Sequence, residues 1–179
     1  MKVLGLVSSP RKGGNGHTLV ENILAGAAEN GAETELIRLT DVEIKPCLDC
    51  GFCKKEGNTT CMQKDAMADI YAKLEAADAV VFGMPIYYGR PNAPFLGFID
   101  RMYAMANPDF SPRLPKDKKF ATVITLGGGG LDVVEQNHAT LAGIFGGMFG
   151  WKDEGFLWKN MMHDRDRKST RLNSSHEST

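Results

Sequence analysis

Residues 2–18 read KVLGLVSSPRKGGNGHT, a short apolar run that passes into a glycine-rich segment. The run from Lys2 to Ser8 is typical of a buried strand. Apolar residues then recur at helical spacing over residues 19–27, which predicts a helix with one buried face. A strand, a glycine-rich loop and a helix in this order form the opening unit of an α/β fold.

The same alternation of apolar runs and helical spacing continues to about residue 160. We expect further strands at 33–39, 79–84, 120–126 and 151–158, and further helices around 67–74, 95–102 and 141–148. Residues 86–94 are expected to form a loop, and the prolines of residues 107–119 indicate an irregular connector. Continuous apolar runs are typical of strands covered on both faces, so the sequence predicts one α/β domain over residues 1–164.

The end of the chain has a different composition. Residues 165–179 contain one large apolar residue, Leu172, and therefore cannot pack a face against a sheet. A doubly wound sheet needs a closing helix after its fifth strand. We therefore expect that a C-terminal helix is missing and that a disordered or non-native tail takes its place. A natural disordered terminus is the alternative.

Composition excludes several classes of function. The chain has 21 Lys and Arg against 22 Asp and Glu, a formal net charge of −1, so it has no basic field to attract nucleic acid or anionic lipid. No apolar run approaches the roughly 20 residues of a membrane span. The first residues lack the apolar core and cleavage site of a secretory signal. We expect a cytoplasmic protein that binds neither nucleic acid nor membrane.

The glycine-rich segment after the first strand is a candidate phosphate-binding loop. Backbone amides at a helix N-terminus bind phosphate when glycines allow close approach, and Arg11 adds positive charge. The segment has neither the Gly-Lys-Ser/Thr ending of a Walker loop nor the Gly-x-Gly-x-x-Gly spacing, which disfavours nucleoside triphosphates and Rossmann dinucleotides. The alternative is a flexible turn in which Asn15 or Thr18 only caps the helix.

Two later strands also end in loops suited to a ligand. The third strand is followed by Tyr87, Tyr88 and Gly89, and the two tyrosines can pack on a planar ring. The fourth is followed by four glycines, residues 127–130, which leave the backbone bare. Alone, the tyrosines read best as core or interface residues. Open α/β sheets bind ligands at the carboxyl ends of their strands, however, so the three loops together favour a binding site.

All four cysteines fall in one window with the spacing C-x2-C-x2-C-x7-C, namely Cys47, Cys50, Cys53 and Cys61. Two-residue gaps let successive thiolates face one four-iron cluster, and the longer gap lets the last cysteine reach the fourth iron. A structural zinc site and free thiols are the alternatives, although two separated cysteine pairs would be more typical of zinc. Disulfides are disfavoured in a reducing cytoplasm.

These motifs resemble the NAD(P)H-dependent FMN reductase family of flavodoxin-like proteins, particularly its iron–sulfur flavoprotein branch. The resemblance covers residues 2 to about 160 and rests on the Ser-Pro-Arg-Lys segment, Pro-Ile-Tyr-Tyr-Gly, Phe-Ile-Asp-Arg at residues 98–101 and the cysteine window. It implies a flavodoxin-like, doubly wound, five-stranded parallel sheet in the order 2-1-3-4-5. It also implies bound FMN.

The resemblance assigns two sets of FMN-binding residues. Those for the phosphate are Ser9, Arg11, Asn15, His17 and Thr18. Those for the isoalloxazine ring and ribityl chain are Pro85, Ile86, Tyr87, Tyr88 and Gly89, with Gly127 and Gly128 nearby. Because the flavin carries the chemistry, no side chain is expected to act as acid or base. Asp100-Arg101 is read as a structural ion pair or subunit contact, and His138 as a surface or capping residue.

The resemblance therefore implies an FMN-dependent oxidoreductase that takes electrons from NAD(P)H and passes them to flavin, a quinone or another small acceptor. One alternative is an iron–sulfur flavoprotein that receives electrons from ferredoxin through a cysteine-ligated 4Fe–4S cluster. Another is a non-redox module that binds phosphate or a nucleotide on the same fold. The resemblance further implies a homodimer or homotetramer.

Overall fold

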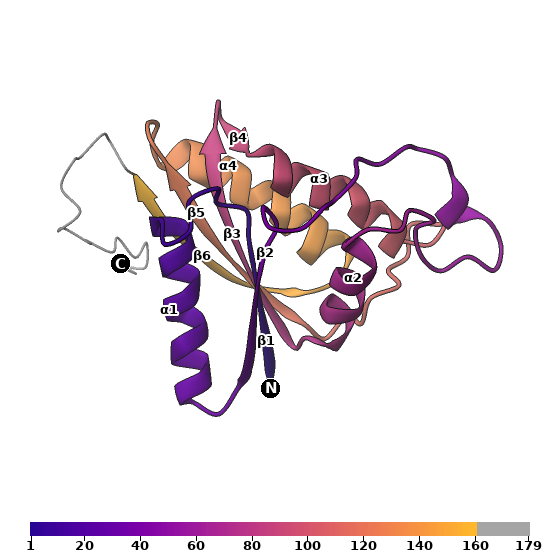
Figure 1. Ribbon diagram of the computed structural model, residues 1–179, viewed down its shortest axis with the longest axis horizontal. Helices are drawn as coiled ribbons and strands as arrows, with labels where there is room; N and C mark the ends of the chain where they lie inside the picture. The colour runs from indigo at the N-terminus through magenta and orange to yellow at the C-terminus, as the bar shows by residue number, and fades with distance from the viewer. Residues whose placement is uncertain (161–179) are drawn as a thin grey trace.

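The structure, a computed structural model, describes residues 1–160 and shows a central sheet with helices on both faces (Figure 1). The expected tail at 165–179, the last residues of the expected domain and the place of a closing helix lie outside the described residues. In chain order the elements are β1 Lys2–Val7, α1 Asn15–Glu29, β2 Glu33–Arg38, η1 Phe52–Lys54, α2 Met67–Ala76, β3 Ala79–Tyr87, β4 Arg90–Pro91, α3 Ala93–Arg101, η2 Met102–Met105, β5 Lys119–Leu126, α4 Leu131–Leu141, η3 Ala142–Met148 and β6 Lys152–Asn160.

The sheet has the order β2-β1-β3-β5-β6, with every neighbouring pair parallel, which confirms the flavodoxin-like arrangement. A sixth, two-residue strand, β4, pairs antiparallel with the end of β3. The expectation of a loop from residue 86 was therefore wrong at its start. Ile86 is buried between Leu126 of β5 and Pro91 of β4, so β3 runs on to Tyr87 before the chain turns.

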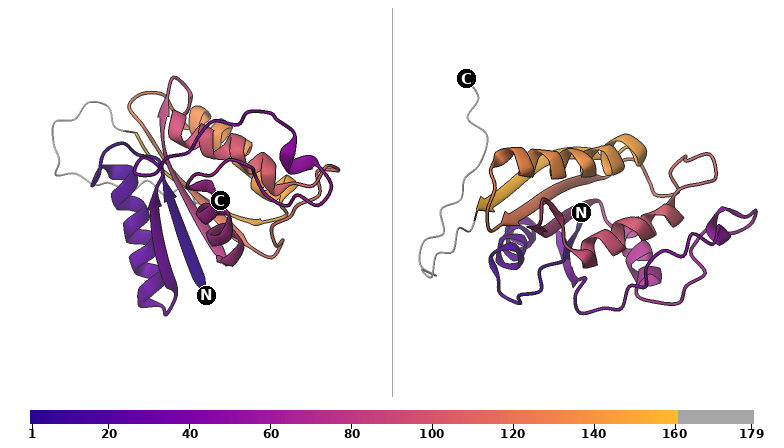
Figure 2. Two further views of the ribbon diagram at one scale, coloured as in Figure 1. Left: turned by 45° about the vertical axis from the view of Figure 1, so that its right-hand side comes forward. Right: turned by 90° about the horizontal axis from the view of Figure 1, so that it is seen from above.

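Helices cover both faces of the sheet (Figure 2). Alternate residues of the strands supply two separate apolar layers, one on each face. On one face, Val3 and Val7 pack with the α1 residues Val20 and Leu24. The opposite, larger layer contains Leu4 and Leu6 and packs against helices α2, α3 and α4. The apolar runs of the sequence are thus explained by burial on both faces.

Small residues let α1 lie close to the strands that it crosses. A Cβ atom on Gly83 of β3 would lie 2.7 Å from Cγ2 of Val20. At the first turn of the helix, a Cβ atom on Gly16 would lie 3.4 Å from Oγ1 of Thr125, the penultimate residue of β5. The N-terminus of α1 therefore lies directly at the carboxyl ends of the central strands.

His138 of α4 links the helix to two strands. Its Nδ1 lies 2.9 Å from Oγ1 of Thr122 in β5, and its Nε2 lies 2.9 Å from a carboxylate oxygen of Asp153 in β6. The ring also packs against Phe156. This differs from the expected surface or capping role, because Thr122 and Asp153 meet the ring only once β6 is paired with β5.

Candidate functional site

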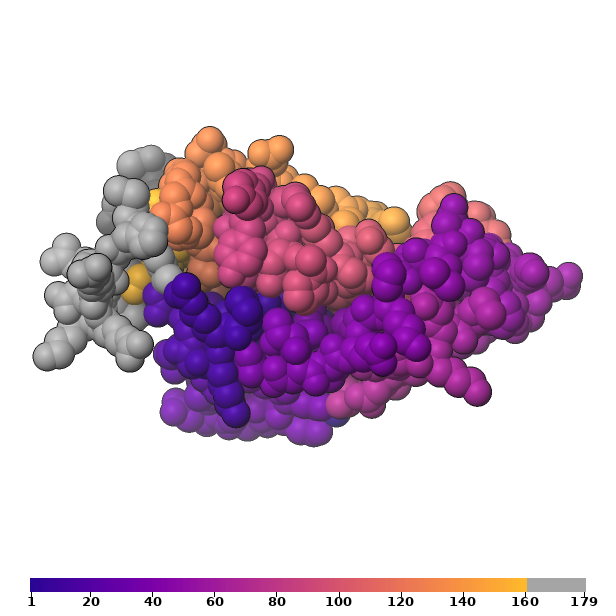
Figure 3. Space-filling view, turned by 45° about the horizontal axis from the view of Figure 1, so that its top comes forward, coloured from indigo at the N-terminus to yellow at the C-terminus, as the bar shows by residue number. Residues whose placement is uncertain are grey.

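The loops that follow β1, β3 and β5 meet at one edge of the sheet. The backbone N–H of Ser8 donates to the carbonyl of Gly83 at 2.9 Å, and Ile86 pairs in register with Leu126. The side-chain amide of Asn92 donates to the carbonyl of Ser8 at 2.6 Å. Figure 3 shows the first loop in indigo, the β3–β4 turn in pink and the β5 loop in orange, gathered at one end of the molecule. The three sequence-predicted loops therefore form one candidate site.

The glycine-rich segment leads into the start of α1. At the N-cap residue, Gly14, no side chain caps the helix, and Thr18 instead donates from Oγ1 to the carbonyl of Gly13 at 3.4 Å. A Cβ atom on Gly14 would lie 2.9 Å from Cβ of Arg11, so the turn requires glycine. Ser9 is buried, and its Oγ accepts from the Arg11 backbone N–H at 3.3 Å. Backbone amides at this helix end suit an anionic ligand.

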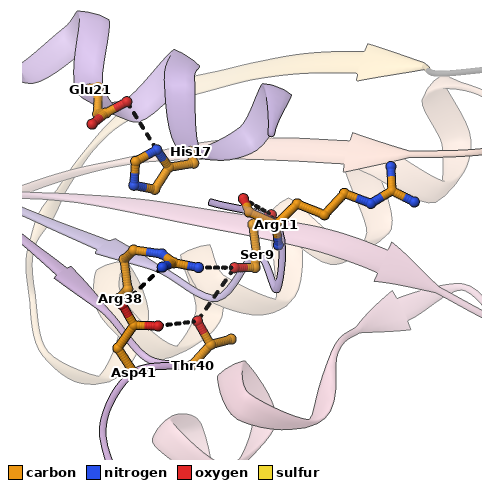
Figure 4. Close-up of polar contacts among 7 residues, drawn as sticks. All are labelled: Ser9, Arg11, His17, Glu21, Arg38, Thr40 and Asp41. Carbon is orange, nitrogen blue, oxygen red and sulfur yellow. Dashed lines mark hydrogen bonds and ion pairs between the residues drawn. The ribbon is translucent and has the colours of Figure 1, made fainter. Parts of the chain in front are cut away.

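Two side chains at the end of β2 and just after it support this segment (Figure 4). Arg38 and Thr40 donate to the Ser9 carbonyl at 3.4 and 3.5 Å. His17 is buried, and its Nδ1 lies 2.9 Å from an Oε atom of Glu21 without the alignment of a hydrogen bond. The Arg11 side chain extends away from this cluster and is exposed. Arg11 thus presents its charge to solvent, as does the neighbouring Lys12, whereas the ring of His17 is buried.

The turn between β3 and β4 presents the second loop. Tyr88 is fully exposed and has a φ of 53°, a left-handed conformation that is costly for a bulky residue. Gly89 follows with a φ of 78°, and its carbonyl accepts a hydrogen bond from the Asn137 side chain of α4 at 3.0 Å. Tyr87 is 48% exposed. The turn therefore holds an exposed aromatic side chain beside bare backbone.

The third loop is the glycine run after β5. Gly127 and Gly128 are exposed, and nothing lies within 4 Å of a Cβ atom placed on Gly128. The side-chain amide of Asn160, at the end of β6, donates to the carbonyl of Gly129 at 2.8 Å. The site thus combines open backbone after β5, the exposed Tyr88 on the neighbouring β3–β4 turn and a start of α1 that no side chain caps. This combination fits a planar ligand that carries a phosphate.

Sequence reasoning did not single out the residues that fasten these loops. Asn92 had a detectable signal, because Asn followed by Ala-Pro is typical of a helix start, and Asn92 is indeed the N-cap of α3. Arg38, Thr40, Asn137 and Asn160 gave no signal, because their partners are carbonyls of distant loops.

The cysteine-bearing segment, residues 45–65, projects from the opposite end of the molecule (Figures 1 and 3). Its two ends are fastened together at the C-terminus of α3. Arg101 donates to the Lys45 carbonyl at 2.8 Å and makes a two-hydrogen-bond ion pair with Asp65, and the Lys45 backbone N–H also donates to Asp65 at 2.9 Å. Asp65 thereby closes the segment at its base.

Burial and hydrogen bonds shift the pKa values of Asp65 and Tyr71 around this ion pair. Burial alone would raise the pKa of Asp65, but hydrogen bonds from Arg101 and from the backbone of Lys45 and Met67 lower that pKa below its usual value. The phenol of Tyr71, which donates to the Arg101 carbonyl at 2.6 Å, has its pKa raised by burial. The Asp65 carboxylate and the Arg101 guanidinium are therefore both ionised at neutral pH.

All four cysteines line one cavity, together with Arg101. Cys53 is buried, Cys61 is half-buried, and Cys47 and Cys50 are exposed. Burial raises the pKa of the Cys53 thiol, which Lys54 and Arg113 partly oppose. Within residues 1–160, no three Cys, His, Asp or Glu side chains are gathered closely enough to hold a metal ion as they stand.

The donor set nevertheless fits a thiolate-ligated metal group in its chemistry. Four thiols on one cavity are the ligands of four-iron clusters and of zinc. Nε of Arg101 is buried and has no hydrogen-bond partner within the described part of the chain, so the cavity wall holds a spare donor. Metal binding would require the four thiols to come closer together than they are in this structure.

Helix α3 joins the two regions. Its N-cap, Asn92, contacts the first loop, and its last residue, Arg101, holds the cysteine segment. A helix of nine residues spans about 14 Å. The cysteine cavity and the three-loop site of one chain are therefore distinct.

No helix in the described residues is both long and apolar enough to cross a membrane.

Comparison with known proteins decides the family. Residues 1–152 match the family described as NADPH-dependent FMN reductase. The chain belongs to this family. Among curated relatives, an iron–sulfur flavoprotein of Methanocaldococcus jannaschii is 42% identical over 101 residues, which cover 56% of this chain and 51% of that protein. An iron–sulfur flavoprotein of Methanosarcina thermophila is 31% identical over 128 residues, covering 72% and 64% of the two chains. The chain thus spans about half to two thirds of the length of these relatives.

Solved structures show the same fold as this FMN reductase family member. An NAD(P)H:quinone oxidoreductase from Methanothermobacter marburgensis superposes with a TM-score of 0.76 at 18% identity, over 94% of this chain and 87% of that one. An FMN-dependent NADH-azoreductase from Bacillus anthracis, solved in complex with FMN, has a TM-score of 0.69 at 16% identity, over 93% and 90%. At these identities the likeness establishes the flavodoxin-like fold alone.

Proposed function

We propose that this chain binds FMN at the three-loop site and is a flavin-dependent oxidoreductase. One observation carries the proposal. The N-terminus of α1, the β3–β4 turn with its tyrosines and the glycines of residues 127–130 all lie at the same edge of the sheet. Membership of the FMN reductase family and the fold shared with an FMN-bound azoreductase support it.

The residues predicted from sequence divide between two tasks. The phosphate would be held by the start of α1 and the segment before it, with Ser9, Arg11, Asn15, His17 and Thr18. Arg11 supplies accessible charge, while His17, whose ring is buried, would contribute its backbone. The ring would lie against the turn and the glycine run, with Pro85, Ile86, Tyr87, Tyr88, Gly89, Gly127 and Gly128. Ile86 is buried, so its contribution is to fix the strand end.

FMN, when bound, supplies the redox chemistry, because its N5 position accepts a hydride or single electrons. The protein's own task is to bind and orient the ring. Asn137 and Asn160 fix the carbonyls of Gly89 and Gly129, so the two loops that border the ring have defined positions. We infer NAD(P)H as the electron donor and a quinone or another small molecule as the acceptor. The exposed Tyr88 and Arg90 would border the nicotinamide.

Titration of FMN with the full chain tests the binding step. Flavin fluorescence should be quenched on binding, and Arg11→Gln should weaken the affinity about tenfold because it removes a charge-assisted contact. The adjacent, exposed Lys12 provides the matched control, since Lys12→Gln should have a smaller effect. Absence of quenching would favour the non-redox phosphate-binding module. Binding of FMN without oxidation of NADH or NADPH in the presence of a quinone would contradict the proposed electron donor and acceptor.

A second candidate function uses the cysteine segment. Four thiols on one cavity, and sequence relatives named iron–sulfur flavoproteins, support an electron carrier with a 4Fe–4S cluster and ferredoxin as partner. Cys47, Cys50, Cys53 and Cys61 would be its ligands. Anaerobic reconstitution with iron and sulfide tests this: a broad visible absorbance that dithionite bleaches is expected, and protein free of iron would leave the simple flavin reductase.

A further inference from the structure

Two cations without acidic partners lie beside the cysteine cavity. Arg101, in the cavity wall, is neutralised by Asp65. Lys54 and Arg113 differ, because within residues 1–160 neither forms an ion pair with a carboxylate. Their hydrogen bonds go to neutral acceptors instead, which satisfies the donors but leaves two positive charges beside the cysteines without a counter-charge among the described residues.

Lys54 is held in one place by main-chain carbonyls. Its Nζ donates to the carbonyls of Tyr103 and Ala106 at 2.7 and 2.5 Å, and it lies 3.9 Å from the centre of the Tyr103 ring. A lysine on a loop surface usually keeps its ammonium group free in water. Here the charge is fixed next to Cys53, the buried cysteine.

Arg113 approaches the same cysteine from the connector after η2. Its Nη2 donates to the carbonyl of Cys53 at 2.7 Å, and its Nη1 donates to the carbonyl of Ala104 at 3.0 Å. Its Nε donates to the side chain of Asn107 at 2.9 Å. Arg113 thus contacts the main chain of Cys53 directly, and Lys54 is the next residue along the chain, so both cations lie beside this cysteine.

We propose that Lys54 and Arg113 compensate the negative charge of a metal group held by the four cysteines. Four thiolates around a divalent ion or a four-iron cluster carry net negative charge, and a partly buried site needs nearby cations to hold it. The proposal rests on the cysteine function suggested above, and it assigns the two residues a positioning and charge-balancing role rather than ligation.

Cobalt titration of the reduced full chain tests the proposal, because thiolate–Co²⁺ bands report both ligation and affinity. Lys54→Gln and Arg113→Gln should each weaken Co²⁺ binding about tenfold, the order expected for one unit charge at short range. Lys55→Gln removes an exposed neighbouring charge and should leave the affinity within about twofold. Quenching of FMN fluorescence, at the distant site, verifies that each variant is folded.

Charge-conserving variants separate electrostatics from loop structure. Lys54→Arg and Arg113→Lys change the hydrogen bonds but keep the charge, so they should bind Co²⁺ nearly as the parent does. In cluster-reconstituted protein, Lys54→Gln should shift the cluster's reduction potential to more negative values, because a cation favours the reduced, more negative state.

Each outcome decides between the proposals. Equal Co²⁺ affinity and unchanged potential in the Gln variants would overturn the charge-balancing role and leave the cysteine site intact. Equal losses in the Gln and charge-conserving variants would show that only loop structure matters, which also overturns it. Absence of thiolate–Co²⁺ bands in the parent chain would overturn both cysteine proposals, while FMN binding would still stand or fall by its own titration.

Discussion

Arg101 at the end of α3 and Asp65 at the end of the cysteine segment form an ion pair that is almost completely buried. Two hydrogen bonds join them, from Nη1 to Oδ2 at 2.5 Å and from Nη2 to Oδ1 at 3.1 Å, and neither side chain is more than 1% exposed. The pair closes the base of a segment of about 20 residues, so its loss should affect that segment first.

Removing one partner of this pair should be strongly destabilising. We expect Asp65→Asn to lower the free energy of unfolding by about 3–5 kcal/mol, because Arg101 would remain buried without its counter-charge. The double variant Asp65→Leu with Arg101→Met should recover only part of the loss, because it removes the unpaired charge but also the hydrogen bonds to the backbone of Lys45 and Met67. Urea denaturation provides the measurement. The exposed pair of Lys2 and Glu33 is the control, since Glu33→Gln should cost no more than about 1 kcal/mol.

The same pair predicts a dependence of stability on pH. Hydrogen bonds hold the pKa of Asp65 in the folded chain below its usual value. Its contribution is therefore fully present above that usual value and is lost as pH falls through the lowered value in the folded protein. Urea denaturation between pH 7 and pH 3 should show the stability gap between parent and Asp65→Asn narrowing towards acid. A gap that stays constant over this range would contradict the assignment.

Tyr88 should separate stability from ligand binding. Its left-handed backbone is costly for tyrosine, but glycine loses more entropy on folding, so Tyr88→Gly should change the free energy of unfolding by less than about 1 kcal/mol. FMN affinity should nevertheless fall about tenfold, because the exposed ring would no longer contact the flavin. Tyr88→Phe keeps the ring and should keep the affinity. Unchanged FMN binding by Tyr88→Gly would remove Tyr88 from the site.

Two glycines offer a matched test of how closely α1 packs on the sheet. Gly83→Ala should destabilise the fold by about 1–3 kcal/mol, because its Cβ atom would lie 2.7 Å from Cγ2 of Val20. Gly26→Ala, within α1 and with nothing within 4 Å of the added Cβ, should instead stabilise by up to about 1 kcal/mol. Thermal unfolding of the two variants should shift in opposite directions.

The parallel strands were predictable because each is buried on both faces and therefore reads as a continuous apolar run. The run from Ala79 to Met84 is an example, and its observed extension to Tyr87 was missed because Pro85 resembles a strand end. β4 could not be predicted, since its two residues carry no periodicity and are defined only by their pairing with Ile86 and Tyr87 of β3.

The sequence predicted those parts of the candidate site that lie in glycine-marked loops. It did not predict the contacts that side chains make with elements distant in the sequence. The structural ion pair expected at Asp100-Arg101 is confirmed for Arg101, but its partner is Asp65, whereas Asp100 is exposed. Spacing located the cysteines in one cavity, yet it gave no sign of Arg113, which reaches Cys53 across 60 residues. Such contacts depend on the folded path of the chain, which local pattern does not encode.

The closure of residues 45–65 at Lys45 and Asp65 fixes the two ends of this segment relative to each other. A loop whose ends are already joined costs little more to close when its interior is lengthened or shortened. The interior also contacts the body of the protein, because Cys53 belongs to the larger apolar layer and Lys54 donates to the carbonyls of Tyr103 and Ala106. Replacing residues 46–64 by a short polar linker, with Arg101 and Asp65 retained, would remove these contacts together with the four thiols, and should lower the free energy of unfolding while leaving the flavin-binding edge in place. Grafting the segment between the same two anchors would transfer its four thiols to a relative that lacks them.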